Sequence, residues 1–502
     1  MRRISIMLIL FICGFSLLFA GGEKESISGV KTIRIAEQVP GLITPGVWDG
    51  QAFSMNSSIY EYLIEIDSNS GELVPLLAKS WGTDDGTNWT FNLREGVKFH
   101  DGSAFNSEDV KYTIERTLDP SIGHLKRPDF EIVDYVEIVD EYTITVHLKE
   151  ARPTFDYQFT DYNMAILSSS YDYDTFGESK PMGTGPYKMV QYIPKESAVL
   201  EKNRDYWDTS VAPIERLLIY FIADIDASVS MLEDDRVDVV PFVTPAIRKR
   251  LESFENVTVI SPYQEQRFIA MRADKAPFDD NNVRLAFKYA MDPHIISRSV
   301  AQSELGKDTN YNETPIMNML VEYKERSLRE RDIDKAKELL AEAGYPNGVT
   351  VDLYYSSDHP FETDLAQTLK ELSAPAGFVL NLKGYTRDIF LSQYWLNVPM
   401  SITGWGGRPD PSMLLALAFK TGGSWNETHM SDSYVDNLIE KISNEVDFEK
   451  RLSYYHDLQD YFYENGALIN FQVPLYIAIN NRVINYSHPL SMIPQYKYMD
   501  IK

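Results

Sequence analysis

A single hydrophobic core cannot contain this chain. It has 502 residues, whereas cores stop growing at about 250–300 residues and longer chains divide into domains. Apolar residues make up 44% of the sequence and charged residues 24%, as in ordinary globular proteins. We therefore expect two or three compact units. The sequence has no internal repeat and no low-complexity linker, so we expect ordered crossings between the domains rather than flexible tethers.

Residues 1–22 have the order of a secretory signal peptide. Two arginines precede an apolar run over residues 4–20, and two glycines follow it. The run is slightly shorter than the roughly 20 residues that span a membrane, and it ends in small residues, which favours cleavage over anchoring. The single cysteine, Cys13, lies inside the run rather than just after it. We therefore predict a periplasmic or secreted protein without a lipid anchor, and no disulfide or thiolate metal site.

The chain is strongly acidic, with a formal net charge of −26. Such a field repels nucleic acid and anionic membrane surfaces. No basic stripe in the sequence offsets it. We therefore expect no nucleic-acid partner.

Strand and helix patterns alternate along the chain, which indicates an α/β fold. Apolar residues occupy every second position over 89–93, 97–99 and 144–148, as in half-buried strands. A helix is predicted from Ser107, which can cap it, with Val110, Ile114 and Leu118 on one face.

The segment 331–345 has the strongest helix pattern. Asp332 or Asp334 can cap its start, and Gly344 can end it in the left-handed conformation that glycine enters without strain. Pro346 then blocks continuation. A second long helix is predicted over 447–463.

The usual catalytic signatures are missing from the sequence. The segment 183–188 begins like a dinucleotide-binding loop but lacks the third glycine, and Pro186 removes an N–H that a phosphate would need. The eight histidines have no His or Cys partner at metal-ligand spacing. The segment 100–102, His-Asp-Gly, is more typical of a strand end and turn than of a catalytic pair. We expect no catalytic residue, no metal and no cofactor.

Aromatic residues are unusually abundant, at 12% of the chain. Three tryptophans, Trp48, Trp405 and Trp425, stand among glycines such as Gly406. Aromatic side chains on glycine-rich loops often wall an apolar binding cleft. Each tryptophan can equally pack its loop onto its own domain, and the sequence leaves both interpretations open.

A series of motifs runs through the chain in a fixed order. It comprises Leu73–Trp81, Trp89–Gly102, Ser107–Val110, Gly183–Tyr187, Asn203–Trp207, Val283–Ala286, Ala290–Asp292, Ala336–Pro346, Gly404–Trp405 and Asp410–Pro411. In order and spacing this series resembles the extracellular solute-binding proteins of peptide-type ABC importers, the dipeptide- and oligopeptide-binding family. The resemblance covers nearly all of the mature chain.

The resemblance implies an α/β, two-lobed periplasmic-binding-protein fold (type II, with an extra subdomain) around a ligand cleft and hinge. By analogy, lobe I comprises 30–59, 181–267 and 476–502, the extra subdomain 60–180, and lobe II 268–475. The implied function is that of a monomeric, non-enzymatic component of an ABC importer. It would capture a small solute, by default a peptide, and deliver it to the permease subunits. Ligand contacts from both lobes would favour the closed form.

One position departs from the family pattern. Peptide-binding members often carry an aspartate three residues after the tryptophan of the Gly-Trp motif, where it pairs with the peptide's amino terminus. This chain has Arg408 there, and an arginine fork suits a carboxylate or phosphate instead. Arg408 can equally pair with Asp410, which by analogy belongs to the turn. The candidate ligand-binding residues are Trp405, Arg408, Asp410, Trp425, Trp48 and Gly406.

Other functions are compatible with these patterns. The same fold can bind an oligosaccharide stacked on tryptophans, or another carboxylate-bearing metabolite. A secreted hydrolase with two catalytic carboxylates would turn its ligand over, whereas a binding protein releases it intact. A chemosensory or adhesive surface protein would show no compaction on binding a ligand.

Overall fold

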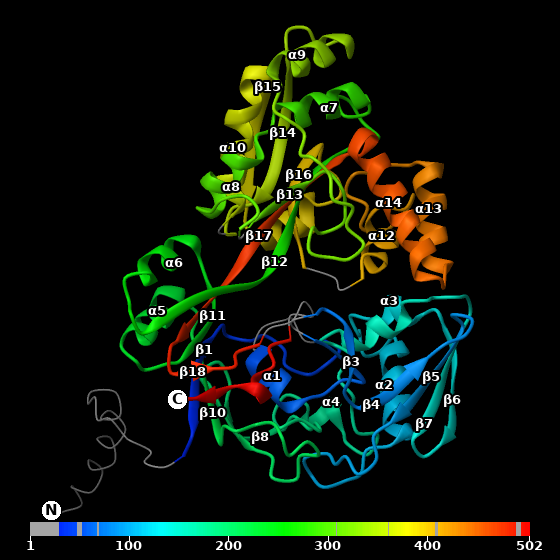
Figure 1. The fold of residues 1–502 in the computed structure, drawn as a ribbon, viewed down its shortest axis with the longest axis vertical. Helices are drawn as coiled ribbons and strands as arrows, with labels where there is room; N and C mark the ends of the chain where they lie inside the picture. The colour runs from blue at the N-terminus through cyan, green and yellow to red at the C-terminus, as the bar shows by residue number, and fades with distance from the viewer. Residues whose placement is uncertain are drawn as a thin grey trace, which may run out of the picture.

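The computed structural model describes residues 30–47, 53–67, 70–307, 309–359, 361–406, 410–487 and 493–502. The predicted signal peptide, Trp48 and Arg408 lie outside these residues. In the described residues, no helix combines the length and the apolar character needed to cross a membrane. Figure 1 shows two lobes, which we call the first lobe (below) and the second lobe (above).

One eleven-stranded sheet extends through both lobes in the order β15-β14-β16-β12-β17-β11-β1-β10-β9-β8, with β13 paired to β17. Its strands are β1 (Thr32–Glu37), β8 (Tyr187–Ile193), β9 (Ser197–Lys202), β10 (Arg216–Phe221), β11 (Val239–Val243), β12 (Val257–Met271), β13 (Asn310–Asn312), β14 (Val349–Ser356), β15 (Phe378–Tyr385), β16 (Met400–Trp405) and β17 (Leu468–Asn480).

The two lobes are joined by the long antiparallel strands β12 and β17 (Figure 1). Their pairing extends from Val257 opposite Asn480 to Ala270 opposite Leu468. The register shifts once, between Ile260 and Tyr263, and such an irregularity bends a strand pair. The connection is therefore ordered strand pairing rather than a loose linker.

The first lobe contains the lower end of this sheet and a separate outer unit. Its helices and short strands are α1 (Phe53–Ile59), α4 (Tyr173–Phe176), α5 (Ile225–Glu233), α6 (Pro245–Leu251), β18 (Val483–Ile484), η4 (Tyr496–Tyr498) and β19 (Asp500–Ile501). Arg34 of β1 and Arg482 both bind the Asp238 carboxylate, at 2.9 and 2.6 Å. This ion-pair group ties the C-terminal segment back to the first strand.

The outer unit of the first lobe contains a four-stranded antiparallel sheet in the order β4-β5-β7-β6, a separate β2-β3 pair and its own apolar core. Its elements are β2 (Ile64–Ile66), β3 (Leu73–Pro75), β4 (Ala78–Gly82), β5 (Asn88–Leu93), α2 (Ser107–Leu118), α3 (Arg127–Phe130), β6 (Val133–Asp140), β7 (Thr143–Leu148) and η1 (Phe155–Thr160). The strands predicted over 89–93 and 144–148 are confirmed as β5 and β7.

Two local predictions in this unit are wrong. Residues 97–99 form no strand; only Lys98 bridges to Ala104, because the chain turns at Gly96 and Gly102, which both have positive φ. Helix α2 is capped by Asn106 rather than by Ser107, which is its first helical residue. The Asn106 side chain accepts from the backbone N–H of Glu108, which Ser107, one residue later, does not do.

The second lobe holds the upper end of the sheet, flanked by helices. These are α7 (Asn281–Ala290), α8 (Pro293–Ala301), α9 (Ile333–Glu342), α10 (Glu362–Ser373), η2 (Ala374–Ala376), α11 (Arg387–Ile389), η3 (Phe390–Tyr394), α12 (Ser412–Ala418), α13 (Ser433–Asn444) and α14 (Phe448–Asn465). The predicted helix in 331–345 is confirmed as α9, with Asp332 as its cap and Gly344 at φ +90°. The helix predicted over 447–463 is α14, capped by Asp447.

Candidate functional site at the facing ends of the two lobes

The carboxyl ends of the parallel strands in the two lobes point toward each other. Strand β12 leaves the first lobe, and β16 runs antiparallel to it, so β16 and the parallel β14 and β15 run toward the first lobe. Strand β17 returns to the first lobe, and β11 runs antiparallel to it, so β11, β1 and β10 run toward the second lobe. In open α/β sheets, ligands bind outside the carboxyl ends of the strands. The space between the lobes is therefore the candidate site.

Trp405 is the last residue of β16 and lies in a cluster of tryptophans. Its ring centroid is 6.4 Å from that of Trp395 and 5.7 Å from that of Trp425. Trp405 is only 6% exposed, whereas Trp425 is 40% exposed. Trp405 therefore packs mainly within the second lobe, and Trp425 keeps an open face.

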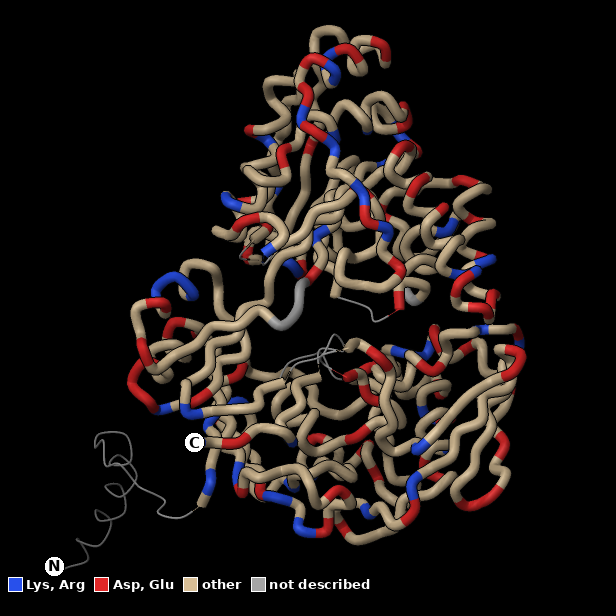
Figure 2. Tube along the Cα trace, viewed as in Figure 1, with Lys and Arg blue, Asp and Glu red and all other residues tan. Residues whose placement is uncertain are grey.

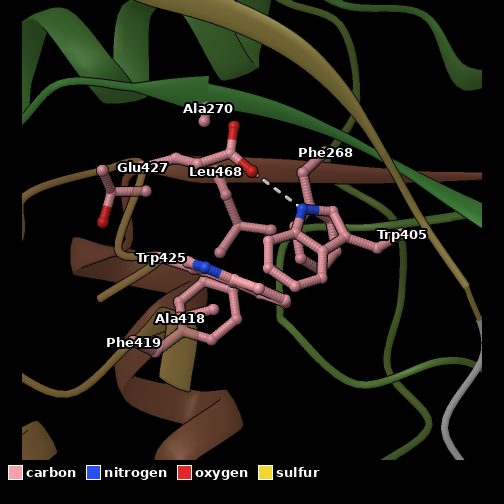
Figure 3. A pocket seen from close by; sticks show the side chains of 9 residues that line it. Phe268, Ala270, Trp405, Ala418, Phe419, Trp425, Glu427 and Leu468 are labelled. Carbon is pink, nitrogen blue, oxygen red and sulfur yellow. Dashed lines mark hydrogen bonds between the residues drawn. The ribbon is translucent and has the colours of Figure 1, made fainter. Parts of the chain in front are cut away.

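The rings of Trp405 and Trp425 line a small pocket (Figure 3). It is lined by Phe268, Ala270, Trp405, Ala418, Phe419, Trp425, Glu427, Thr428 and Leu468. The space within it that a water-sized group can occupy is about 10 Å³, which is roughly the room that one water needs. Sites for whole small-molecule ligands measure about 300–1,000 Å³. The pocket therefore has room for a methyl-sized group and not for an entire cargo molecule.

A buried carboxylate holds this wall in place. Glu427 accepts hydrogen bonds from Trp405 Nε1 at 2.8 Å, Thr403 Oγ1 at 2.7 Å and Ser401 Oγ at 3.1 Å. Figure 3 shows the bond to the indole. Burial raises the pKa of Glu427, and these donors oppose the rise. Glu427 is not evident from the sequence, because nothing in the Asn-Glu-Thr segment marks that glutamate as buried.

Asp410 is engaged within the second lobe. It is 2% exposed and accepts hydrogen bonds from the backbone N–H of Ser412 at 2.7 Å and from Tyr455 Oη at 3.3 Å. Burial raises its pKa. These contacts favour the interpretation that Asp410 belongs to the turn, which the family resemblance also implied. Gly406 follows β16 and is half-buried. Because Arg408 lies outside the described residues, its two interpretations remain predictions.

A second polar cluster lies beside the Gly-Trp motif. The Arg267 side chain, on β12, is buried; its Nη2 donates to Glu265 at 2.6 Å and also contacts His359 Nε2. Burial, and then the Arg267 charge, lower the pKa of His359 to about 2. A Cβ on Gly404 would stand 2.3 Å from Arg267 Nη1. The glycine of the motif therefore makes room for a guanidinium group, a contact that no pattern in the sequence indicates.

The Gly-Thr-Gly-Pro-Tyr motif is a packing feature of the first lobe. A Cβ on Gly183 would stand 2.1 Å from the carbonyl oxygen of Ile59, and one on Gly185 would stand 2.6 Å from it. Thr184 Oγ1 donates to the buried Glu61 carboxylate at 2.8 Å, and Tyr206 Oη donates at 2.7 Å. Two of the motifs thus meet at one buried carboxylate.

The His100-Asp101-Gly102 segment forms a turn, as the sequence favoured. The His100 Nε2 lies 3.0 Å from the carbonyl oxygen of Gly185, whereas the Asp101 carboxylate accepts from Ser103. The two side chains thus have separate partners. Within the described ranges, no group of three or more His, Cys, Asp or Glu is arranged to hold a metal ion.

Comparison with known proteins places these features in a family. The model described as bacterial extracellular solute-binding proteins, family 5 Middle, matches residues 72–426, more than two thirds of the chain. Heme-binding protein A of Haemophilus influenzae is 28% identical over 477 residues, covering 87% of this chain and 86% of that protein.

Solved structures share the fold. The periplasmic binding protein DppA from Helicobacter pylori, in complex with the peptide STSA, has a TM-score of 0.77 at 21% identity, covering 94% of this chain and 98% of that one. The murein tripeptide binding protein MppA, in an unliganded open form, has a TM-score of 0.78 at 19% identity, covering 94% and 98%. The expected two-lobed α/β fold is confirmed.

Proposed function

Because the chain belongs to the bacterial extracellular solute-binding proteins of family 5, the substrate-binding components of ABC importers, we propose that it captures a short peptide between its two lobes and hands it unaltered to a membrane permease. The proposed location is periplasmic or secreted, after removal of residues 1–22. The proposed state is a monomer with the lobe boundaries given above.

The observation that carries this proposal is that the carboxyl ends of the parallel strands in the two lobes face each other across the space between the lobes. Ligand contacts from both sides stabilise the closed form only if they are stronger there than in the open form. The pocket at Trp405 and Trp425 offers the second lobe's share of these contacts to an apolar peptide side chain. The surface that it exposes is apolar, which suits a methyl group and not a charged one.

The peptide's polar ends require other partners. We assign the peptide carboxylate to Arg408, since a guanidinium presents paired donors to a carboxylate. Trp48 and Gly406 are proposed to complete the site from either side. Asp410 is proposed to act indirectly, through its hydrogen bond from the Ser412 backbone at the start of α12.

The test is calorimetric binding of a tripeptide and tetrapeptide panel that varies one side chain between apolar and charged. Trp425→Ala is expected to weaken binding of apolar members by about tenfold, since an aromatic contact contributes about 0.5–1.5 kcal/mol beyond burial. The matched control is Tyr135→Ala on β6, an exposed aromatic that is 53% accessible on the outer sheet. It is expected to leave affinity unchanged.

Amidated peptides test the role of Arg408. Wild type should bind the free carboxylate more tightly than the amide, and Arg408→Ala should bind both equally. Haemin and oligosaccharides belong in the same panel. Binding of one of these in place of every peptide, or recovery of cleaved peptide, would contradict the proposal.

A further inference from the structure

The two lobes touch through a buried hydrogen bond. Thr154 Oγ1, just before η1 in the first lobe, lies 3.0 Å from Ser412 Oγ, the first residue of α12 in the second lobe. Thr154 is 4% exposed and Ser412 is 5% exposed. Opening the lobes at this edge would break the bond and admit water.

Carboxylates surround this contact from both lobes. Asp156 lies two residues after Thr154 and accepts from Trp81 Nε1 at 3.0 Å. Asp410 lies two residues before Ser412 and accepts from its backbone N–H. Glu322 of the second lobe is 5% exposed, and within the described residues its Oε2 has no hydrogen-bond partner.

Within the described residues, the other titratable and charged groups at this contact do not balance the charge of its carboxylates. Tyr157 lies beside Asp156 on η1, and Tyr455 and Arg451 lie on α14. Arg451 is the cation that acts on Asp410 and Glu322, and its Nη1 donates to the carbonyl oxygen of Glu445 at 2.8 Å. Among the described residues, one guanidinium therefore acts on two of the three carboxyl groups. Figure 2 shows acidic and basic positions on both lobes, and the chain as a whole carries an excess of acidic residues.

Burial and mutual repulsion both raise the pKa values of these carboxyl groups. Burial is the main cause that raises the pKa of Asp156 to about 6, and the Asp410 charge from the other lobe adds to it. Burial and the Asp410 charge likewise raise the pKa of Glu322 to about 7. The pKa of Tyr157 is also raised, by burial first and then by all three carboxylates.

A proton is the neutralising species that fits this arrangement. The carboxylates of Asp156 and Asp410 already accept hydrogen bonds. In the part of the chain that the structure describes, no set of three or more His, Cys, Asp or Glu side chains is arranged to hold a metal ion. A proton on Glu322 would give its unpartnered oxygen a donor to share with a neighbour.

We propose that closing the lobes at the Thr154–Ser412 contact takes up protons on Asp156 and Glu322, so that the closed form becomes more populated as the pH falls. In the open form Asp156 is separated from Asp410 and hydrated, so it binds its proton only near the ordinary aspartate range. The closed form binds protons more tightly, and lowering the pH therefore shifts the equilibrium toward it.

The test is small-angle X-ray scattering of the unliganded protein from about pH 8 to about pH 5.5. This range includes the raised pKa values of Asp156 and Glu322. The radius of gyration should fall as the pH falls, corresponding to a rise of roughly tenfold or more in the closed-to-open ratio. Circular dichroism at each pH checks that the fold is intact. Because no ligand is present, this result is independent of the cargo proposal.

Three variants complete the test. Asp156→Asn and Glu322→Gln, one in each lobe, should each compact the protein at the alkaline end and flatten its pH response. The matched control is Glu37→Gln. Burial also raises the pKa of Glu37 to about 7, but its hydrogen bond is to Ser54 within the first lobe. It should respond as wild type. A radius of gyration that is constant with pH, or a pH response that survives both variants in folded protein, would overturn the inference.

Discussion

The indole nitrogen of Trp405 and the carboxylate of Glu427 are joined by a 2.8 Å hydrogen bond that fixes the end of β16 to the loop after Trp425. Two further hydroxyl donors converge on the same carboxylate. Glu427 therefore holds the wall of the apolar pocket in place and does not present a charge to the cargo.

Replacing Glu427 tests this role. Glu427→Ala leaves three buried donors without an acceptor, and we expect a loss of about 2–4 kcal/mol in the free energy of unfolding. Denaturant titration followed by tryptophan fluorescence measures it, and the fluorescence should shift as the ring loses its partner. Glu440→Gln, at an exposed position of α13, is the control and should change stability by less than about 0.5 kcal/mol. An equally small effect of Glu427→Ala would contradict this role.

The contact between Gly183 and Ile59 predicts a steric defect. An alanine methyl at position 183 would collide with a backbone carbonyl that has little freedom to move, so Gly183→Ala should cost about 1–3 kcal/mol. Gly82→Ala provides the comparison, because a Cβ there meets no atom within 4 Å. Thermal unfolding of the two variants should separate them clearly. Equal melting temperatures would show that the first lobe tolerates the methyl group.

The ion pairs at Asp238 predict that electrostatic attraction holds the C-terminal segment against β1. Asp238 is fully buried, while Arg34 and Arg482 are partly exposed. Burial opposes its ionisation, but bonds from both arginines outweigh this and hold its pKa below the ordinary value. Asp238→Ala should therefore cost about 2–4 kcal/mol. Urea unfolding measures the loss, with the exposed Asp234→Ala as control. A loss no larger than that of the control would mean that packing alone secures the return.

His124 predicts a pH dependence of stability. It is 6% exposed, and its Nδ1 accepts from the backbone N–H of Lys126 at 3.1 Å, which requires the neutral ring. Burial is the main cause that lowers its pKa to about 4. The stability contribution is therefore complete above the unfolded value of about 6.5 and is lost as the pH falls toward about 4.

Chemical denaturation at about pH 7 and about pH 5 measures this contribution, which should amount to about 2 kcal/mol. His124→Gln should remove that part of the acid destabilisation. The exposed His294→Gln should retain it. If His124→Gln and wild type lose stability in parallel, the ring does not stay neutral in the fold.

Local elements were predictable from the sequence because their causes are local. Asp332 and Gly344 bound α9 within one stretch of chain, and alternation located β5 and β7. The same reasoning failed where neighbours compete, as when Asn106 capped α2 instead of Ser107.

The candidate site was predictable only in part. The Gly-Trp motif directed attention to Trp405, but its partner Glu427 stands 22 residues later, and no periodicity connects the two. Arg267, which occupies the space beside Gly404, reaches it from another strand. A single sequence carries no signal for such pairings, because burial of a polar side chain depends on which strands become neighbours.

By itself, the sequence determined the α/β class, the division into more than one domain and the order of motifs, since composition, periodicity and turn chemistry act over short stretches of chain. Only the tertiary structure decided that the strands of both lobes end face to face, and that Asp156 meets Asp410 across the contact between them. Those relationships arise from the antiparallel crossing of β12 and β17, which brings together residues hundreds of positions apart and removes water from their carboxyl groups.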